Sequence, residues 1–381
     1  MTIGFDAKRA AQNGTGLGNY SRFIIGLLAK YAPEIGLKLY VPNPKKADML
    51  CRLPDTNNIT TIYPQKIWER LFRSLWRTFG ITKHLKLDGI TLFHGLSNEL
   101  PLNIRKAKGI KSVVTIHDIL YLRFPQGYKW IDRKLYNFKY RKACQNADRI
   151  IAVSQFTKEE IVRWYGIDPK RISVIYQGCD ESFRHKCTEE QLTITRQRYH
   201  LPDHYILYVG SIERRKNLKL LAQALHHING DIEVIAAGRR TPHANEVEQF
   251  LKENGLSERM HLRSDIPFAD FPALYQMADV FVYPSHCEGF GIPMLEALCS
   301  GVPAIGCTGS CLEEAGGPDS AYVNPTDSVA LAAEINDILS NTLRRQKMIE
   351  QGLKYAELFA EDKLFSQLIS FYRNLEKDAA N

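Results

Sequence analysis

Two glutamates flank a glycine-rich turn in the last third of the chain. Glu288 precedes the residues Gly-Phe-Gly-Ile-Pro, and Glu296 follows them, in what we expect to be the first turn of a helix. Free N–H groups and the helix dipole at such a helix start favour an anion such as a diphosphate. Because carboxylates would repel that anion, we expect the two side chains to accept hydrogen bonds from hydroxyl groups of a sugar and of a ribose. A plain loop followed by an acid that stabilises the helix start has the same pattern.

A second cluster is basic. The apolar run Tyr205–Val209 ends at Gly210, and Arg214, Arg215 and Lys216 follow it, just before a segment of helical period. Cations at the carboxyl end of a strand are well placed to neutralise phosphates. A solvated basic turn is the competing interpretation.

The N-terminal segment contains a third candidate, a loop with Gly14, Gly16 and Gly18. It resembles the dinucleotide-binding pattern G-x-G-x-x-G but has Asn19 at the last position, and no acid follows the next predicted strand. We therefore do not predict an NAD site. The loop still allows a phosphate to approach the backbone amides closely.

A histidine supplies the fourth candidate. His117 and Asp118 follow the apolar run 112–116, at the strand edge where ligands bind. A neutral imidazole there can hydrogen-bond a substrate hydroxyl, and a structural histidine explains the pattern at least as well. The pair by itself forms neither a catalytic triad nor a metal site.

Strand-like runs and segments of helical period alternate along the chain, which predicts two parallel α/β domains. We expect an N-terminal domain over 1–185, a C-terminal domain over 195–357, and a terminal helix over 358–381 that returns to the first domain. A polar stretch at 179–195 is predicted to be an irregular connector. Ligands of such sheets bind at the carboxyl ends of the strands, so the active site is expected in the cleft between the domains. The predicted strands cover residues 2–6, 39–41, 91–94, 112–117, 149–153, 172–176, 205–209, 232–237, 280–283 and 302–305.

Composition excludes several classes of protein. The chain has 381 residues and is 44% hydrophobic, as globular proteins are, and its apolar runs are too short to cross a bilayer. With no basic leader at the N-terminus, we predict a cytoplasmic protein. Its eight cysteines include no Cys-x-x-Cys pair, so neither a zinc site nor a disulfide framework is predicted.

The formal charge of +8 is unevenly distributed. Residues 1–180 contain 30 Lys and Arg against 14 Asp and Glu, a net charge of +16, whereas residues 181–381 contain 20 against 28, a net charge of −8. A basic half concentrates anions, such as phospholipid headgroups, nucleic acid or phosphorylated metabolites. No nucleic-acid recognition motif is visible, so nucleic acid is not a predicted partner.

Two basic segments also contain aromatic residues. Residues 66–86 place an apolar stripe with two tryptophans beside six Lys and Arg, and residues 128–142 repeat the combination. An interfacial helix and an ordinary core helix with a solvated face both fit this pattern. One hypothesis is that the basic domain docks on anionic lipid, peripherally on the inner face of the cell membrane, to reach a lipid-linked acceptor.

Together these motifs resemble the retaining glycosyltransferases of family four. The resemblance covers nearly the whole chain and rests on the Glu288 to Glu296 pattern, the basic segment, the N-terminal glycine loop, His117-Asp118 and the segment 147–154. It implies the GT-B fold, in which two Rossmann-like domains face a cleft. One departure is Ser211, where many members have arginine, so the phosphate role would depend more on Arg215 and Lys216.

The resemblance also implies roles for individual residues. Glu296 would hold the ribose hydroxyls and Glu288 the donor sugar, which His117 would also touch. Arg215 and Lys216 would bind the diphosphate and stabilise it as the leaving group. The remaining donor-binding positions implied are Gly16, Gly18, Gly210, Gly238, Phe290 and Gly291.

The predicted function is therefore transfer of a hexose with retention, without a metal or other cofactor, from a nucleoside-diphosphate sugar to a surface polysaccharide or lipid-linked glycan. The branch that this basic segment resembles is rich in mannosyltransferases, which favours GDP-mannose as the donor. A nucleotide-sugar epimerase of the same fold and a binding protein without catalytic activity remain alternatives.

Overall fold

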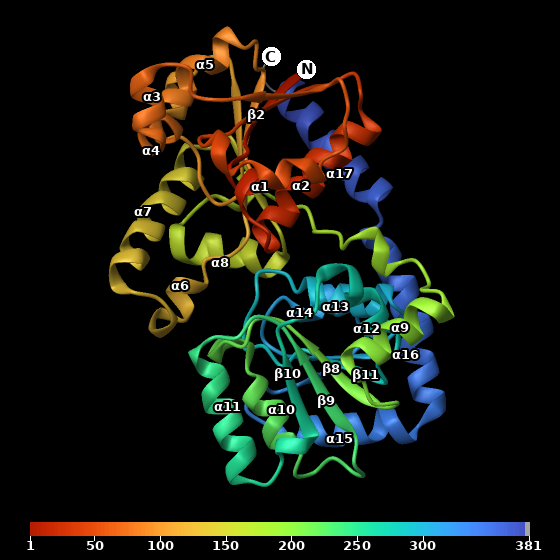
Figure 1. Cartoon of the computed structure of the whole chain (residues 1–381). Helices are drawn as coiled ribbons and strands as arrows, with labels where there is room; N and C mark the ends of the chain where they lie inside the picture. The colour runs from red at the N-terminus through yellow and green to blue at the C-terminus, as the bar shows by residue number, and fades with distance from the viewer. Residues whose placement is uncertain (378–381) are drawn as a thin grey trace. The chain divides into compact units, whose positions relative to one another are not determined.

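The computed structural model describes residues 1–377 and divides the chain into two compact units (Figure 1). One unit comprises residues 1–177 together with the C-terminal segment from residue 361, and the other comprises residues 178–360. The domains predicted from the sequence, 1–185 and 195–357, have slightly different boundaries from these units. The last four residues of the segment expected to form the terminal helix lie outside the described part of the chain.

The first unit is built around one parallel sheet. Its strand order is β3-β2-β1-β4-β5-β6-β7, and Phe5 of β1 pairs with Leu39 of β2 on one side and with His94 of β4 on the other. Its elements are, in chain order, β1 (Thr2–Asp6), α1 (Lys8–Gln12), α2 (Gly16–Tyr31), β2 (Gly36–Tyr40), β3 (Ile59–Ile62), α3 (Ile67–Leu71), α4 (Arg73–Leu75), α5 (Ile81–Leu87), β4 (Leu92–Gly95), β5 (Lys111–Ile116), α6 (Leu120–Arg123), α7 (Trp130–Asn146), β6 (Arg149–Ala152), α8 (Gln155–Tyr165), β7 (Ile172–Val174) and α17 (Glu361–Lys377).

The terminal helix α17 completes the first unit. Its apolar face, with Leu368 and Tyr372, joins the core cluster that contains Ile24 and Leu28 of α2. Lys30 of α2 pairs with Glu361 at the start of α17, with 2.6 Å between the charged atoms. Helices α2 and α17 accordingly lie side by side in Figure 1.

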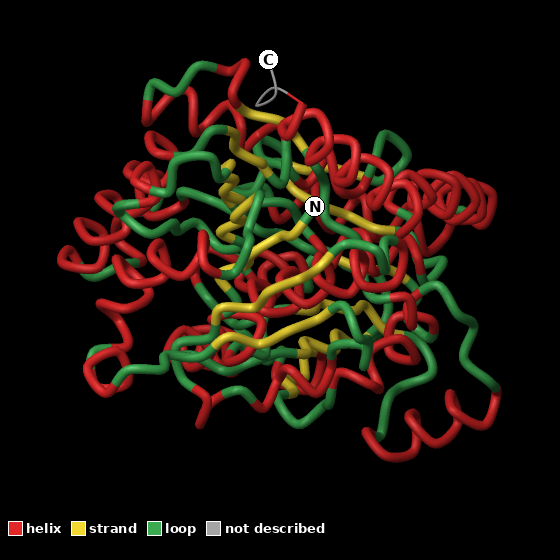
Figure 2. Tube along the Cα trace, turned by 90° about the horizontal axis from the view of Figure 1, so that it is seen from above, coloured by secondary structure: helices red, strands yellow, loops and turns green. Residues whose placement is uncertain are grey.

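The second unit contains a smaller parallel sheet, in the order β10-β9-β8-β11-β12-β13. The alternation of strands and helices can be followed along the trace in Figure 2. The elements are α9 (Glu189–Tyr199), β8 (Tyr205–Val209), α10 (Leu218–Ala224), β9 (Glu233–Ala237), α11 (Pro242–Glu253), β10 (Met260–Arg263), α12 (Phe271–Gln276), β11 (Val280–Val282), α13 (Ile292–Cys299), β12 (Ala304–Cys307), α14 (Leu312–Gly316), β13 (Ala321–Val323), α15 (Ser328–Ser340) and α16 (Thr342–Ala356).

The predicted fold class, two parallel α/β domains, is confirmed. Three strands were not predicted, β3, β10 and β13, and each lies at the edge of its sheet. Central strands are covered on both faces and therefore form continuous apolar runs, whereas β3 and β10 are partly exposed and contain polar residues, and β13 has only three residues. The prediction of an irregular connector at 179–195 is wrong in part, because α9 begins there, with a capping box between Thr188 and Gln191.

None of the helices within residues 1–377 has both the length and the apolar character needed to span a bilayer.

Candidate active site

The topology of the second sheet brings two of the predicted clusters together. Strands β8 and β11 are neighbours in the sheet although β9 and β10 separate them in sequence. The basic segment follows the carboxyl end of β8, and the segment with Glu288 follows that of β11. Such a switch in strand order is where open α/β sheets bind their ligands.

Glu288 is bound to both of the predicted phosphate-binding cations. Its Oε2 lies 2.7 Å from Nη1 of Arg215, and its Oε1 lies 3.5 Å from Nζ of Lys216. All three side chains are less than one fifth exposed. The structure therefore places Glu288 as an anchor that fixes the direction of both cations.

The electrostatic environment keeps Glu288 ionised. Burial alone would raise the pKa of its carboxyl group, but the charges of Lys216 and Arg215 outweigh that effect and lower the pKa to about 2. The group is therefore a carboxylate at any physiological pH and accepts hydrogen bonds without donating one.

Three residues of this site were not predicted. Tyr283 and Ser285 each donate a hydrogen bond of 2.9 Å to Oε1 of Glu288, and Lys216 donates one of 2.6 Å to the Tyr283 hydroxyl. Asn217, with a left-handed backbone, donates from Nδ2 to the carbonyl oxygen of Pro284 at 3.1 Å. The one available signal was the position of Tyr283 and Ser285 at and just after the end of a predicted strand, five and three residues before Glu288.

Glycines let the chain ends of β8 and β9 approach each other. A Cβ atom on Gly238 would lie 2.0 Å from the carbonyl oxygen of Gly210, so no other residue fits there. A Cβ atom on Gly210 would lie 3.2 Å from Nζ of Lys216. Gly210 thus keeps space open around the lysine that faces Glu288, and Gly238 allows the close approach of the two chain ends. Ser211, the departure from the family pattern, donates a hydrogen bond to Glu213 at 2.7 Å.

The glycine-rich turn leads into helix α13 as the sequence predicts. Gly291 is the N-cap residue with a φ angle of +115°, which favours glycine, and Pro293 lies in the first turn. The ring of Phe290 is buried and lies 5.6 Å from that of Phe359, so this side chain stabilises the turn from within. The backbone of the turn is consequently held at the start of the helix, where N–H groups have no partner in the helix itself.

Glu296 lies in the second turn of α13, one turn further into the helix than expected. It is buried, and its Oε2 accepts a hydrogen bond of 2.9 Å from the hydroxyl of Tyr275. Burial raises the pKa of this carboxyl group to about 7, against the lowering effect of the Tyr275 hydrogen bond. Unlike Glu288, this glutamate changes its charge close to neutral pH.

The glycines of the N-terminal loop differ in what surrounds them. Gly18 is buried in α2, and a Cβ atom there would lie 1.8 Å from the carbonyl oxygen of Asn13, so close packing requires glycine. Gly16 opens the same helix, is exposed, and has open space where a Cβ atom would lie. Packing therefore explains Gly18, whereas it does not explain Gly16.

His117 lies in the first unit directly after β5, and its ring is already hydrogen-bonded. Nε2 lies 2.9 Å from the carbonyl oxygen of Leu96, which can only accept, so Nε2 carries the proton. Nδ1 lies 3.4 Å from the side-chain nitrogen of Gln177. Burial lowers the pKa of His117 to about 4, so the ring is neutral. In this arrangement the expected contact with a sugar would require one of these bonds to open.

A buried polar chain lies behind His117. The hydroxyl of Tyr372 lies 2.7 Å from Nδ1 of His94, and Nε2 of His94 lies 2.8 Å from the Thr115 hydroxyl. The Thr115 hydroxyl also lies 3.1 Å from the hydroxyl of Tyr20. The Tyr20 ring packs edge-on against the His117 ring, with 4.6 Å between the ring centres. Helix α17 is thereby connected to the residues around His117.

The predicted site residues thus fall into two groups. Those of the second unit lie around the β8 and β11 ends, and Gly16, Gly18 and His117 lie in the first unit. Among the described residues, no group of three or more His, Cys, Asp or Glu side chains is arranged to hold a metal ion.

Sequence comparisons identify the same regions. Residues 194–355 match the model of the glycosyl transferases group 1, and residues 30–183 match that of Glycosyltransferase Family 4. O-antigen chain mannosyltransferase B of Escherichia coli is 30% identical over 290 residues, which cover 74% of either chain. The O-antigen chain mannosyltransferase RfbU of Salmonella typhimurium is 27% identical over 226 residues, covering 59% of this chain and 60% of the relative.

Solved structures share the architecture. Sucrose-phosphate synthase from Thermosynechococcus elongatus superposes with a TM-score of 0.80 over the full length of both chains, at 21% identity. HepE from Anabaena, solved in complex with UDP and glucose, gives 0.75 at 18% identity over 98% of this chain and 99% of its own. This chain therefore belongs to the group 1 glycosyltransferases of family four and has the GT-B fold.

Proposed function

We propose that this chain transfers mannose from GDP-mannose, with retention of configuration, to a growing surface polysaccharide or lipid-linked glycan. The names of the relatives support the sugar and the acceptor class, since both O-antigen relatives described above are mannosyltransferases. The observation that carries the proposal is the buried arrangement of Arg215, Glu288 and Lys216 where the strand order of the second sheet switches.

In the proposed reaction, the bond between the anomeric carbon and the nucleoside diphosphate breaks while the bond to the acceptor oxygen forms on the same face of the sugar. The acceptor's hydroxyl proton passes to an oxygen of the departing phosphate. Arg215 and Lys216 stabilise the negative charge that develops on the diphosphate, and the Glu288 anchor holds them in place beforehand. The first turn of α13 offers further N–H groups to the same anion.

The side chains described above support a route without a protein nucleophile. Glu288 is ionised but bound by two cations and two hydroxyls, and His117 uses both ring nitrogens within the first unit. Neither group stands ready to attack the sugar. We propose that no metal takes part either, and activity that persists in excess EDTA would support this.

The test is incubation of the full chain with GDP-mannose and with a panel of UDP-sugars. We expect slow hydrolysis of GDP-mannose and not of the UDP-sugars. A mannan oligosaccharide should make consumption of the donor faster, and NMR of the transfer product should show an α-linkage. Interconversion of the sugars would instead indicate an epimerase. Thermal stabilisation by donors without turnover would indicate a protein that only binds them.

A further inference from the structure

The segment 67–87 exposes an unusual amount of apolar surface. The sequence left open whether its aromatic stripe belongs to the core, and the structure decides this residue by residue. Trp76 is fully buried, whereas Ile67 and Leu71 are 78% and 72% exposed. The other exposed apolar side chains of this segment are Trp68, Phe72, Leu75, Phe79 and Leu87.

Helix α7 presents a second exposed stripe. Ile131, Leu135 and Phe138 follow each other at helical spacing and are all exposed, and Trp130 at the helix start is 69% exposed. The opposite face of the same helix packs into the core through Ala143 and Cys144. Helix α7 is therefore apolar on its outer side as well as on its inner side, which a surface helix of a soluble domain normally avoids.

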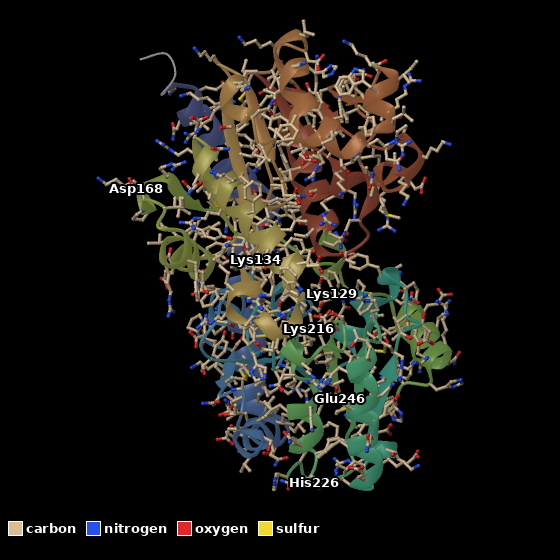
Figure 3. All side chains as sticks on the ribbon, turned by 90° about the vertical axis from the view of Figure 1, so that its left-hand side faces the viewer. Lys129, Lys134, Asp168, Lys216, His226 and Glu246 are labelled. Carbon is tan, nitrogen blue, oxygen red and sulfur yellow. The ribbon has the colours of Figure 1, made fainter. Side chains whose placement is uncertain are left out.

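Cations surround both stripes. Those that are exposed and form no ion pair within the described residues are Lys66, Arg70, Lys83, Lys86, Lys129, Lys134, Arg141 and Lys142. The side chains of Lys129 and Lys134 stand on the side of the unit turned toward the viewer in Figure 3. Glu69 and Asp132 are the only acids in these segments, so they offset little of this charge, and Glu69 is buried against His84 and two backbone N–H groups.

The two segments form one surface of the first unit. Glu99 connects them, since its Oε2 lies 2.8 Å from Nη1 of Arg77 and 3.3 Å from Nζ of Lys139 on α7. A second connection runs through Leu102, which donates a backbone hydrogen bond to Thr78 and accepts one from the Asn146 side chain. Helices α3, α4 and α7 accordingly lie on the same side of the unit in Figure 1. We call the exposed apolar and basic residues of 66–87 and 129–142 the basic aromatic surface.

We infer that the basic aromatic surface is a docking site for an anionic phospholipid bilayer. Exposed aromatic and aliphatic side chains flanked by lysine and arginine match the two layers that a membrane interface presents, acyl chains below and phosphate groups above. Charge decides between the occupants of such a patch. A second copy of this chain would bring the same cations face to face, whereas anionic headgroups neutralise them.

This inference stands apart from the sugar that is transferred, because docking uses none of the residues of the candidate active site. It complements the proposed function by holding the chain where a lipid-linked acceptor is found. Binding to vesicles is measured without any substrate, so failure of docking and failure of the proposed transfer are separate results.

The experiment is co-sedimentation of the full chain with vesicles of phosphatidylcholine alone or mixed with phosphatidylglycerol. We expect at least about tenfold stronger binding to the anionic vesicles, falling as salt is added. The charge variant Lys129→Glu, Lys134→Glu, Lys142→Glu should lose this preference. A matched control, Lys186→Glu, Lys252→Glu, Lys347→Glu, changes the same number of exposed lysines in the second unit and should keep it.

A second pair of variants separates insertion from mere charge attraction. Leu71→Ser, Trp130→Ser, Ile131→Ser should reduce binding to anionic vesicles even at low salt. The tryptophan fluorescence of the parent chain should shift to the blue on binding, and this shift should be smaller in the variant, which lacks Trp130. The control Val329→Ser, Leu343→Ser, Leu358→Ser removes exposed apolar residues from the second unit and should bind as the parent does.

Three outcomes would overturn the inference. The first is equal binding to neutral and anionic vesicles, and the second is unchanged binding by both surface variants. The third is a dimer in light scattering that the Leu71, Trp130 and Ile131 changes abolish, because the surface would then cover a second copy. Unchanged melting temperatures confirm that the variants remain folded.

Discussion

The buried site around Glu288 in the second unit and the buried histidines of the first unit are chemically unlike. In the second unit, the ends of β8 and β11 bring a carboxylate together with two cations, and the pKa of Glu288 falls to about 2. In the first unit, His117 follows β5 and His94 lies in the neighbouring strand β4, and burial lowers their pKa values to about 4 and about 3. The Glu288 site is thus fixed in a charged state and this pair of histidines in a neutral state.

We propose that this difference reflects a division of labour within one chain. Fixed charges recognise an ion such as a diphosphate. The strength of this interaction depends on the charges being held in position before the ligand arrives. Neutral, fully hydrogen-bonded groups such as His117 give shape and direction at little electrostatic cost, as an uncharged sugar needs. Each prediction below changes one side of this comparison.

The largest effect is expected for Glu288→Gln. The amide keeps the shape but no longer neutralises Arg215 and Lys216, so both cations lose their fixed direction. We expect kcat to fall by about 100-fold or more, as on removal of one preorganised charged group. Transfer from GDP-mannose measures it, with Glu213→Gln, which meets Arg215 only at 3.7 Å, as the control. Turnover within about twofold of the parent would refute the site, because removal of one preorganised charged group lowers kcat far more than that.

The next effect is expected for Lys216→Met. This change removes a cation that a diphosphate would meet and should weaken donor binding about 10- to 100-fold, the range for hydrogen bonds to charged groups. Arg214→Met is a close control, because Arg214 is 77% exposed and pairs with Glu246 instead. Calorimetric titration with GDP-mannose compares the two variants. Equal losses of donor affinity in the two variants would show that donor binding depends only on the overall charge of the segment.

A smaller effect concerns pH and Glu296. Burial raises the pKa of its carboxyl group to about 7, and only the ionised form accepts charge-assisted hydrogen bonds from ribose hydroxyls with both oxygens. Donor affinity should therefore rise between pH 6 and pH 8, by at most about tenfold, since ionisation spans roughly that range. Glu288 and His117 titrate below this window, so Glu296→Gln should abolish the dependence.

The effect of Glu296 on stability has the opposite sign. An acid whose pKa is higher in the folded than in the unfolded chain stabilises the fold below the unfolded value of about 4.5, and that contribution is lost as pH rises through about 7. Thermal unfolding of the parent and of Glu296→Gln from pH 5 to pH 8 should show this loss in the parent alone. Parallel curves would contradict the assigned pKa.

The smallest effect on function is expected in the first unit. Tyr372→Phe removes the hydroxyl that bonds to His94 and leaves a buried ring nitrogen without its partner, which costs about 1–3 kcal/mol of unfolding free energy. Donor affinity should not change. Tyr31→Phe is the control, since its hydroxyl bonds Glu361 at the surface at 3.3 Å. A loss of donor binding in Tyr372→Phe would break the separation between the two units' tasks.

The sequence predicts the interior of each sheet better than its edges. Strand β8 is apolar throughout and β1 is apolar between its two end residues, because helices cover both of their faces. Their limits agree with the predicted ones. Strands β3 and β10 are short and partly polar, and β13 has only three residues, so no local pattern distinguishes them from loops. Their place is decided by the neighbouring strand to which they pair.

The candidate site follows the same rule. Arg215, Lys216 and Glu288 stand out by type and spacing, but nothing in the sequence says that they bind one another. Tyr283 and Ser285 read as strand end and loop, and only their hydrogen bonds to Glu288 place them in the site. His117 was expected to offer a nitrogen to a substrate, whereas Leu96 and Gln177 occupy its ring.

By itself, the sequence determined the α/β class, the family and the residues that carry charge, because these depend on local period and on motifs that are contiguous along the chain. Only the tertiary structure decided which charges neutralise each other, which aromatic residues of 66–87 face the solvent, and that α7 is apolar on its outer side. The pKa of a carboxyl group and the exposure of a side chain depend on partners distant in the sequence. The two glutamates therefore look alike in the sequence and differ by about five pKa units in the fold.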